Sequence, residues 1–241
     1  MNNDKILTSI VSLGKRLQSS FDSELPFSVI ASTILDWQEL CQREMEISDL
    51  ETAAFRGFLR DQFRRLTDTE AFYGGRTFSL KRLEAVTGYI ASQIQNASRA
   101  KLNTLLFYSD FVSYFLEGSS ISGSRYVHTS LGPQAEHYDE VLKALTDDRG
   151  RNSLDSNNQH DRISLGYTSL DQLTLLDVSA INWVLDNVGS LSLAKLSEIS
   201  SLEYALRFTY VDDFIPYHLA KHFHKLPDPP RKHLYVRGPG H

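Results

Sequence analysis

The sequence predicts a mainly α protein with a small β element, an α+β fold in which helices are followed by a second helical part that carries a short two-stranded sheet. Apolar residues recur at three- and four-residue spacing over most of the chain, as on one face of a helix. Two short stretches, Tyr126-Val-His-Thr129 and Ile163–Tyr167, lack this spacing, and we expect them to be strands that pair with each other. The 241 residues are 41% hydrophobic and 23% charged, which is typical of folded proteins.

The first 97 residues are expected to form a helical region. Its helices are predicted to begin near residue 5, at Pro26, after Ser48 and after Thr67, and each of the last two starts has the spacing of a capping box. Gly74-Gly75 then ends the fourth helix, and a fifth is expected from about Ser79 to Gln95. Residues 96–99 form the expected hinge to the next part. This region resembles no family that we can name.

The remainder of the chain begins with a helix expected over Lys101–Glu117, apolar on nearly all sides and therefore central. Gly118 is placed to end this helix with a positive φ, and Gly123 suits a tight turn. Further helices are predicted at Gln134–Leu145 and at 171–188, 192–200, 201–209 and 216–226. Residues 146–161 are polar and predict an exposed loop, and residues 227–241 a flexible tail rich in proline and glycine.

Charge and composition narrow the classes of function. The sequence has 25 basic and 30 acidic residues, which gives a net charge of −5. The overall electrostatic field of such a chain would not attract it to the phosphates of nucleic acid. A single cysteine, Cys41, closes no intrachain disulfide. No apolar run reaches the roughly 18 residues of a membrane span, and the amino end has no signal-peptide pattern. We therefore expect a cytoplasmic protein without a membrane partner.

Patterns of catalysis and metal binding are weak. The sequence has no Gly-x-Ser-x-Gly elbow and no phosphate-binding glycine loop, so we expect no catalytic residue and no cofactor. His218 and His222 have the four-residue spacing that lets two imidazoles share a metal, but no third ligand is identifiable. The alternative is a solvated helix end with favourable charge, and we predict no metal site. The expectation is that the protein is not an enzyme.

Three arginines form the clearest candidate for a binding surface. Arg56, Arg60 and Arg64 follow one another at four-residue spacing and would lie along one helix face, where guanidinium groups can bind carboxylates or phosphates. Nearby acidic residues, among them Asp61, would instead make this an ordinary solvated face. A protein partner is the preferred functional interpretation, and nucleic acid is the other.

Residues 101–226 carry a series of short motifs in a fixed order. The helix 102–111 ends in Tyr108-Ser-Asp110-Phe111, Gly118 follows, and then Ile121-Ser-Gly123 with Tyr126; Leu131-Gly132-Pro133 precedes a helix, and Leu196–Ser200 and Ile215-Pro216-Tyr217 come last. Together these resemble the Panacea antitoxin family, the SocA-like domain of toxin–antitoxin modules and phage-associated proteins. The chain departs from that pattern at Thr104 and Ser201, where lysine and histidine are frequent in the family. The same residues also suit an ordinary structural scaffold.

The resemblance implies an antitoxin that neutralises a cognate protein toxin by direct contact. Together with the helix pattern it divides the chain into three expected parts: the helical region 1–97, a Panacea-like domain over 98–226, and the tail 227–241. Candidate partner contacts are Arg56, Arg60, Arg64 and Tyr126. Two alternatives remain: a DNA-binding regulator that represses its own gene, and an adaptor that delivers a bound partner to a protease. The toxin, the oligomeric state and any role in phage defence are not specified by these residues.

Overall fold

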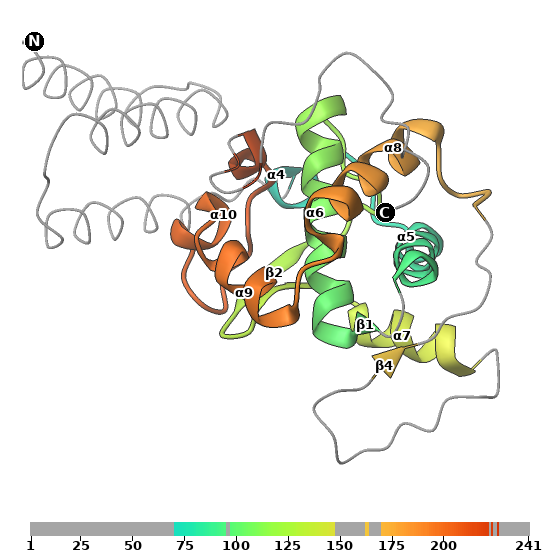
Figure 1. The fold of residues 1–241 in the computed structure, drawn as a ribbon. Coiled ribbons are helices and arrows are strands. Elements are labelled where there is room, and N and C mark those ends of the chain that lie inside the picture. Colours follow the sequence, from blue (N-terminus) through green and yellow to red (C-terminus); the bar gives the residue numbers. More distant parts are fainter. Residues whose placement is uncertain are drawn as a thin grey trace, which may run out of the picture. The chain divides into compact units, whose positions relative to one another are not determined.

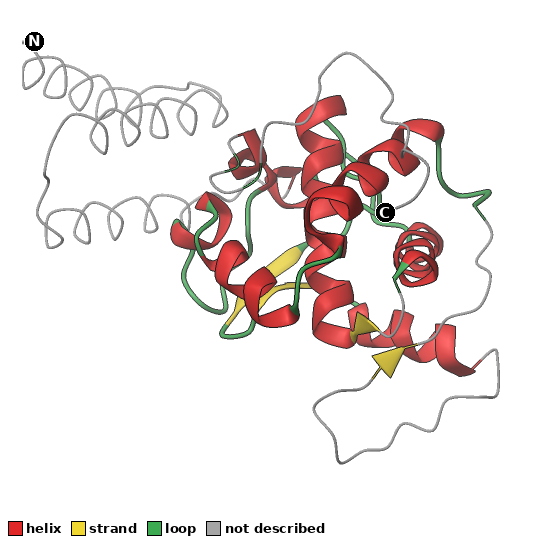
Figure 2. Ribbon diagram, in the orientation of Figure 1, coloured by secondary structure: helices red, strands yellow, loops and turns green. Residues whose placement is uncertain are grey.

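The computed structural model describes residues 70–94, 97–147, 162–163, 170–221, 223 and 226 (Figure 1). In this part of the chain helices dominate and two small antiparallel sheets accompany them (Figure 2). The prediction of a mainly α protein with a small β element is therefore confirmed. The helices expected before residue 70, the arginines 56, 60 and 64 and the tail lie outside the described residues, as do residues 148–161 of the polar loop expected at 146–161. The first two residues of that expected loop are instead the end of a helix.

The elements follow one another in this order: α4 (Glu70–Tyr73), α5 (Leu80–Gln93), β1 (Ala97–Ser98), α6 (Arg99–Glu117), β2 (Tyr126–Thr129), β3 (Gly132–Ala135), α7 (Tyr138–Asp147), β4 (Arg162–Ile163), α8 (Leu175–Val184), the π-helical turn η1 (Leu185–Gly189), α9 (Leu193–Ser201), α10 (Tyr204–Arg207) and the 3-10 helix η2 (Tyr217–Lys221).

Helix α6 is the centre of the fold. It packs against α5, α8, α9, β3 and η2, and Figure 1 shows it running through the middle of the surrounding elements. The Ser98 hydroxyl accepts from the amide of Lys101 at its start, and Gly118 ends it in the left-handed region with φ 69°. Residues 102–113 are all buried, as the all-round apolar pattern predicted. The predicted central helix and its glycine stop are both present.

The strand pairing differs from the prediction. β2 pairs with β3 instead of with residues 163–167, and the register Thr129↔Gly132 leaves a two-residue hairpin loop. Ile163 pairs with Ala97 in the separate β1–β4 sheet. Neighbouring strands joined by so short a loop close with little loss of chain entropy, which favours the local partner.

The helix predicted from Gln134 is also wrong at its start, because residues 132–135 form β3 and α7 begins at Tyr138. His137 has a φ of 59°, which separates strand from helix. The side chain of Asn103 explains why these residues stay extended: its Nδ2 donates to the Pro133 carbonyl at 2.5 Å and its Oδ1 accepts from the Ala135 amide at 3.1 Å. One α6 side chain therefore satisfies the outer edge of β3.

We expect Asn103→Leu to lower the free energy of unfolding by about 2–4 kcal/mol, because a buried carbonyl and a buried amide would each lose their partner. The measurement is unfolding in urea. Gln134→Leu is the control, since Gln134 is exposed on the same strand and its replacement should stay within about 0.5 kcal/mol. Equal effects of the two substitutions would contradict the role of Asn103.

Of the predicted carboxyl-terminal helices, the one at 192–200 is present as α9, one residue later, and the others are shorter than predicted. The helix expected at 171–188 begins at residue 175, because Thr174 and Asp177 form a capping box there, and its end is the π-helical turn η1. The segment expected to be helical at 201–209 contains only the four-residue α10, and η2 replaces the described part of the helix predicted at 216–226. Before η2, backbone atoms of residues 212–215 bond to β2, with Ile215 donating to the Tyr126 carbonyl at 2.8 Å.

Candidate functional site

Asp110, on α6, is the centre of a buried polar cluster. Its side chain has no exposed surface, and Oδ1 accepts from the amides of Ile121 and Ser122, each at 2.9 Å. Oδ2 accepts from the hydroxyl of Ser122 and from that of Tyr126, the latter at 2.8 Å. One carboxyl group therefore joins the central helix to the following turn and to β2.

Burial sets the protonation chemistry of this cluster. It raises the pKa of Asp110 above its ordinary range, although the hydrogen bonds from Ser122, Tyr126 and Ile121 oppose that shift. Burial, followed by the nearby Asp110 carboxyl, raises the pKa of Tyr126 and of Tyr217 well above 10. Both phenols consequently stay protonated and act as donors. Tyr217 donates to the Ser124 carbonyl at 2.8 Å, and its oxygen lies 3.4 Å from Asp110 Oδ2.

Residues 119–124, which we call the serine turn, connect Asp110 to residues 74–78, which we call the glycine loop. The Ser120 amide donates to the Gly74 carbonyl at 2.7 Å. The Ser120 hydroxyl donates to the carbonyl of Tyr73, the residue before the loop, at 3.1 Å. At the other end of the loop, the Ser79 amide donates to the Ser122 carbonyl at 3.0 Å. The loop is thus fixed at both ends.

Gly123 brings the two segments into direct contact. Its φ is 72°, and a Cβ built there would lie 2.6 Å from the Thr77 carbonyl oxygen and 2.7 Å from that of Arg76. A side chain at this position would therefore meet backbone atoms as well as the strain of a left-handed conformation. The glycine allows the serine turn to pack directly against the backbone of the glycine loop.

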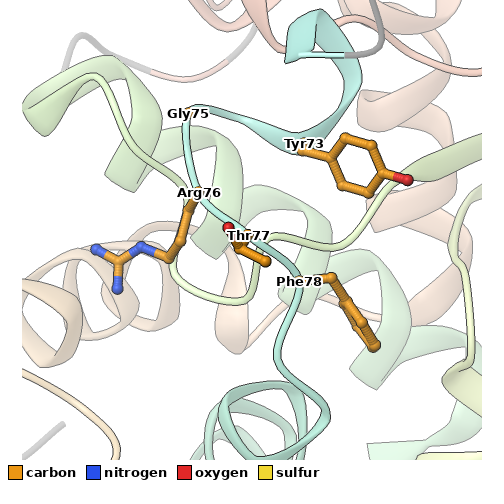
Figure 3. A pocket seen from close by; sticks show the side chains of 5 residues that line it. All are labelled: Tyr73, Gly75, Arg76, Thr77 and Phe78. Atoms are coloured by element: carbon orange, nitrogen blue, oxygen red, sulfur yellow. The ribbon is translucent and has the colours of Figure 1, made fainter.

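A pocket of about 510 Å³ lies at the glycine loop, lined by Tyr73, Gly75, Arg76, Thr77 and Phe78 (Figure 3). Figure 3 shows the rings of Tyr73 and Phe78 on one side of the chain and the guanidinium group of Arg76 extending to the other. The Arg76 Nη2 donates to the Ser119 hydroxyl at 3.3 Å. Such a pocket is large enough for a side chain or a small ligand.

Ring and charge contacts surround the aromatic side of the pocket. The guanidinium of Arg125 lies 5.3 Å from the ring centre of Tyr73, and it forms a paired contact with Glu136 at 2.6 and 2.7 Å. The ring of His137, the next residue, is 5.1 Å from that of Phe78. The two pocket aromatics are thereby supported by Arg125, the residue before β2, and by His137 of the β3–α7 connection.

The residues expected from sequence have different outcomes. Arg56, Arg60 and Arg64 lie outside the described residues, as does His222. Tyr126, which we expected to contact a partner, has 0% exposed surface, and its hydroxyl donates to Asp110. Its ring therefore lies in the interior and not on the described surface.

The motif residues expected to form a scaffold lie in or beside the core. Tyr108 and Phe111 are buried on α6, the hydroxyl of Tyr108 lying 3.5 Å from Glu203, and Pro216 and Tyr217 are buried at the start of η2. The remaining positions are Gly118, which ends α6, Gly123 in the serine turn, and Gly132 and Pro133, which begin β3.

Sequence reasoning missed the pocket residues Tyr73, Arg76 and Phe78 and the supporting pair Arg125–Glu136. The available signal was the Gly74-Gly75 pair between aromatic residues, which we interpreted only as a helix stop. The partners that hold this loop are more than forty positions away in sequence, as the 47-residue separation of Ser120 and Tyr73 shows. Residue spacing within the loop does not reveal them.

Over the ranges that the structure describes, no group of three or more histidine, cysteine or acidic side chains is arranged to hold a metal ion. Within the same ranges, no helix has both the length and the apolar character needed to cross a membrane.

Comparison with known families gives a match in the middle and later part of the chain. The family model described as "Antitoxin SocA-like, Panacea domain" matches residues 102–204. This segment is similar to the SocA-like Panacea domain. The Panacea domain thus begins inside α6, contains Asp110 and the serine turn, and ends at the start of α10. The match indicates a role related to toxin–antitoxin systems, in a family that is not typically enzymatic. Searches of curated proteins and of solved structures gave no match.

Contacts extend the folded unit beyond the matched Panacea residues. Ser98 caps α6 before the match begins, and Tyr217 packs against Asp110 and the serine turn after it ends. The glycine loop also precedes the match and is bonded to it through the Ser120 amide, which donates to the Gly74 carbonyl. These contacts support, as a proposal, a domain that includes residues 98–226 and the glycine loop as an attached surface.

Proposed function

We propose that the protein is an antitoxin that neutralises a cognate protein toxin by binding it directly. The observation that carries this proposal is the Panacea match over residues 102–204. The buried network around Asp110 supports it, because it fixes the serine turn and the glycine loop in one arrangement before any partner binds. A preorganised surface loses less conformational entropy on binding than a mobile one.

Neutralisation would follow from occlusion of the toxin's active surface or of its substrate. A few well-packed aromatic and arginine side chains usually supply most of the binding free energy at such an interface. Residues of this kind surround the pocket at the glycine loop, including Tyr73, Phe78 and Arg125. The interaction is proposed to take place in the cytoplasm, and a role in defence against phage is one use of such a pair.

The test is co-expression with the product of the adjacent open reading frame. We expect that product alone to arrest growth, the full chain to restore colony formation, and the two proteins to co-purify as a complex. A chain that stops before residue 102 is the control and should not restore growth, because it lacks the Panacea domain. Growth arrest that the full chain does not relieve, without a complex, would reject the proposed function.

A further inference from the structure

The geometry points to the glycine loop as the site where the toxin docks: a non-polar side chain of the toxin enters the pocket beside Tyr73 and Phe78, and a neighbouring acidic residue of the toxin pairs with Arg76. This inference rests on the proposed function and specifies its contact surface. It assigns the partner a stated chemistry, an acidic segment with an apolar anchor.

The pocket itself favours a buried anchor side chain. Tyr73 and Phe78 form its aromatic wall, and a volume of about 510 Å³ leaves space for a large apolar side chain of a partner. Both rings are held in place, Tyr73 against the Arg125 guanidinium and Phe78 against the His137 ring. Anchors that fill preformed aromatic pockets are the typical hot spots of protein interfaces.

Charge complementarity favours an acidic partner. Residues 74–82 contain Arg76, Lys81 and Arg82 and no acidic residue, although the chain as a whole has a net charge of −5. Arg82 pairs with Asp177, whereas Arg76 contacts the hydroxyl of Ser119 and has no carboxylate partner among the described residues. Its side chain is half-buried, so its charge is available to a carboxylate at the surface.

The placement of these side chains favours a protein over a small molecule. The aromatic rings and the Arg76 guanidinium lie on opposite sides of the loop in Figure 3, and Gly75 and Thr77 between them are exposed. A protein surface can contact both sides of the loop at once. The serine turn contacts the backbone of the glycine loop through Ser120 and Gly123. These contacts hold the loop surface in one arrangement before a partner docks.

The experiment measures binding of the full chain to the toxin encoded by the adjacent gene, together with rescue of growth. We expect Arg76→Glu to weaken binding at least tenfold, about the effect of losing one charge-assisted contact, and Phe78→Ala to weaken it about thirtyfold. Circular dichroism and thermal unfolding check that each variant is folded. Lys195→Glu and Leu131→Ala are the matched controls, since they reverse an exposed charge on α9 and remove an exposed apolar side chain of the β2–β3 loop.

Suppressor selection adds a readout that general destabilisation would not produce. Starting from the Arg76→Glu chain, toxin variants that regain binding should exchange an acidic residue for lysine or arginine. Normal binding by both folded loop variants, or loss on Leu131→Ala with the loop variants unaffected, would overturn the docking site while leaving the antitoxin function intact. Failure of the wild-type chain to bind or neutralise the toxin would reject the proposed function, and the docking site with it.

Discussion

Replacement of Asp110 by alanine is expected to lower the free energy of unfolding by more than about 3 kcal/mol, or to prevent folding. The change removes the acceptor of the Ile121 and Ser122 amides and of the Tyr126 hydroxyl, all within the core. A buried donor without a partner costs about 1–3 kcal/mol, and the amides cannot reorient as a hydroxyl can. A loss of this size is a large fraction of the usual stability of a domain.

Urea unfolding of the full chain measures this effect, with Asp139→Ala as the matched control. Asp139 is an aspartate that pairs with Arg99 at 2.5 Å, but 68% of its side chain is exposed. Exposed ion pairs contribute at most about 1 kcal/mol. Similar losses for the two alanine variants would contradict the structural role of Asp110.

The variant Asp110→Asn gives a pH-dependent form of the same prediction. Burial raises the pKa of Asp110 in the folded state above the unfolded value of about 3.9, so the folded state binds the proton more tightly. The contribution of Asp110 to stability is then greatest below that unfolded value and decreases as pH rises toward the folded pKa. Relative to the asparagine variant, the wild type should therefore lose stability on going from pH 4 upward. A relative gain would show that hydrogen bonding outweighs burial.

The central helix shows what the sequence can specify. Local features determine both of its ends, because Ser98 caps the first turn and Gly118 adopts a positive φ at the last. The apolar pattern between them covers every side, which predicts a helix surrounded by other elements. Its prediction was correct within two residues because none of these features depends on a distant part of the chain.

The hairpin shows where local patterns fail. The sequence predicts a helix from Gln134, directly after Gly132-Pro133, but Asn103 supplies hydrogen bonds that hold residues 132–135 as a strand. That contact joins residues about thirty positions apart, and periodicity carries no information about it. Four-residue strands also contain too few residues for the alternation of a strand to be distinguished from chance.

The candidate site was only partly predictable for the same reason. The motif placed Asp110 and Gly123 in one scaffold, but it did not show that the Asp110 carboxyl binds the amides of the serine turn or that Gly123 faces the backbone of Thr77. A buried carboxyl and a run of serines each have ordinary interpretations when considered separately. They form one hydrogen-bonded cluster only because the fold brings the serine turn back onto α6.

Gly123→Ala is expected to destabilise the protein by several kcal/mol more than Gly118→Ala. Both glycines have nearly the same backbone conformation, with φ of 72° and 69°, so both variants incur the cost of about 1 kcal/mol for a left-handed residue. They differ in their surroundings: a Cβ at Gly118 would have no atom within 4 Å, whereas one at Gly123 would lie 2.6 Å from the Thr77 carbonyl oxygen.

The difference between the two alanine variants therefore isolates the contact between the serine turn and the glycine loop. Thermal and urea unfolding of the full chain measure it, and equal losses would show that this contact can relax without cost. Relief of the clash requires the backbone of Thr77 and Arg76 to move, because neither obstructing atom belongs to a flexible side chain. If the glycine loop is the docking site, folded Gly123→Ala protein will bind the toxin more weakly than Gly118→Ala, since its displaced loop no longer presents Phe78 and Arg76 in the arrangement that the partner contacts.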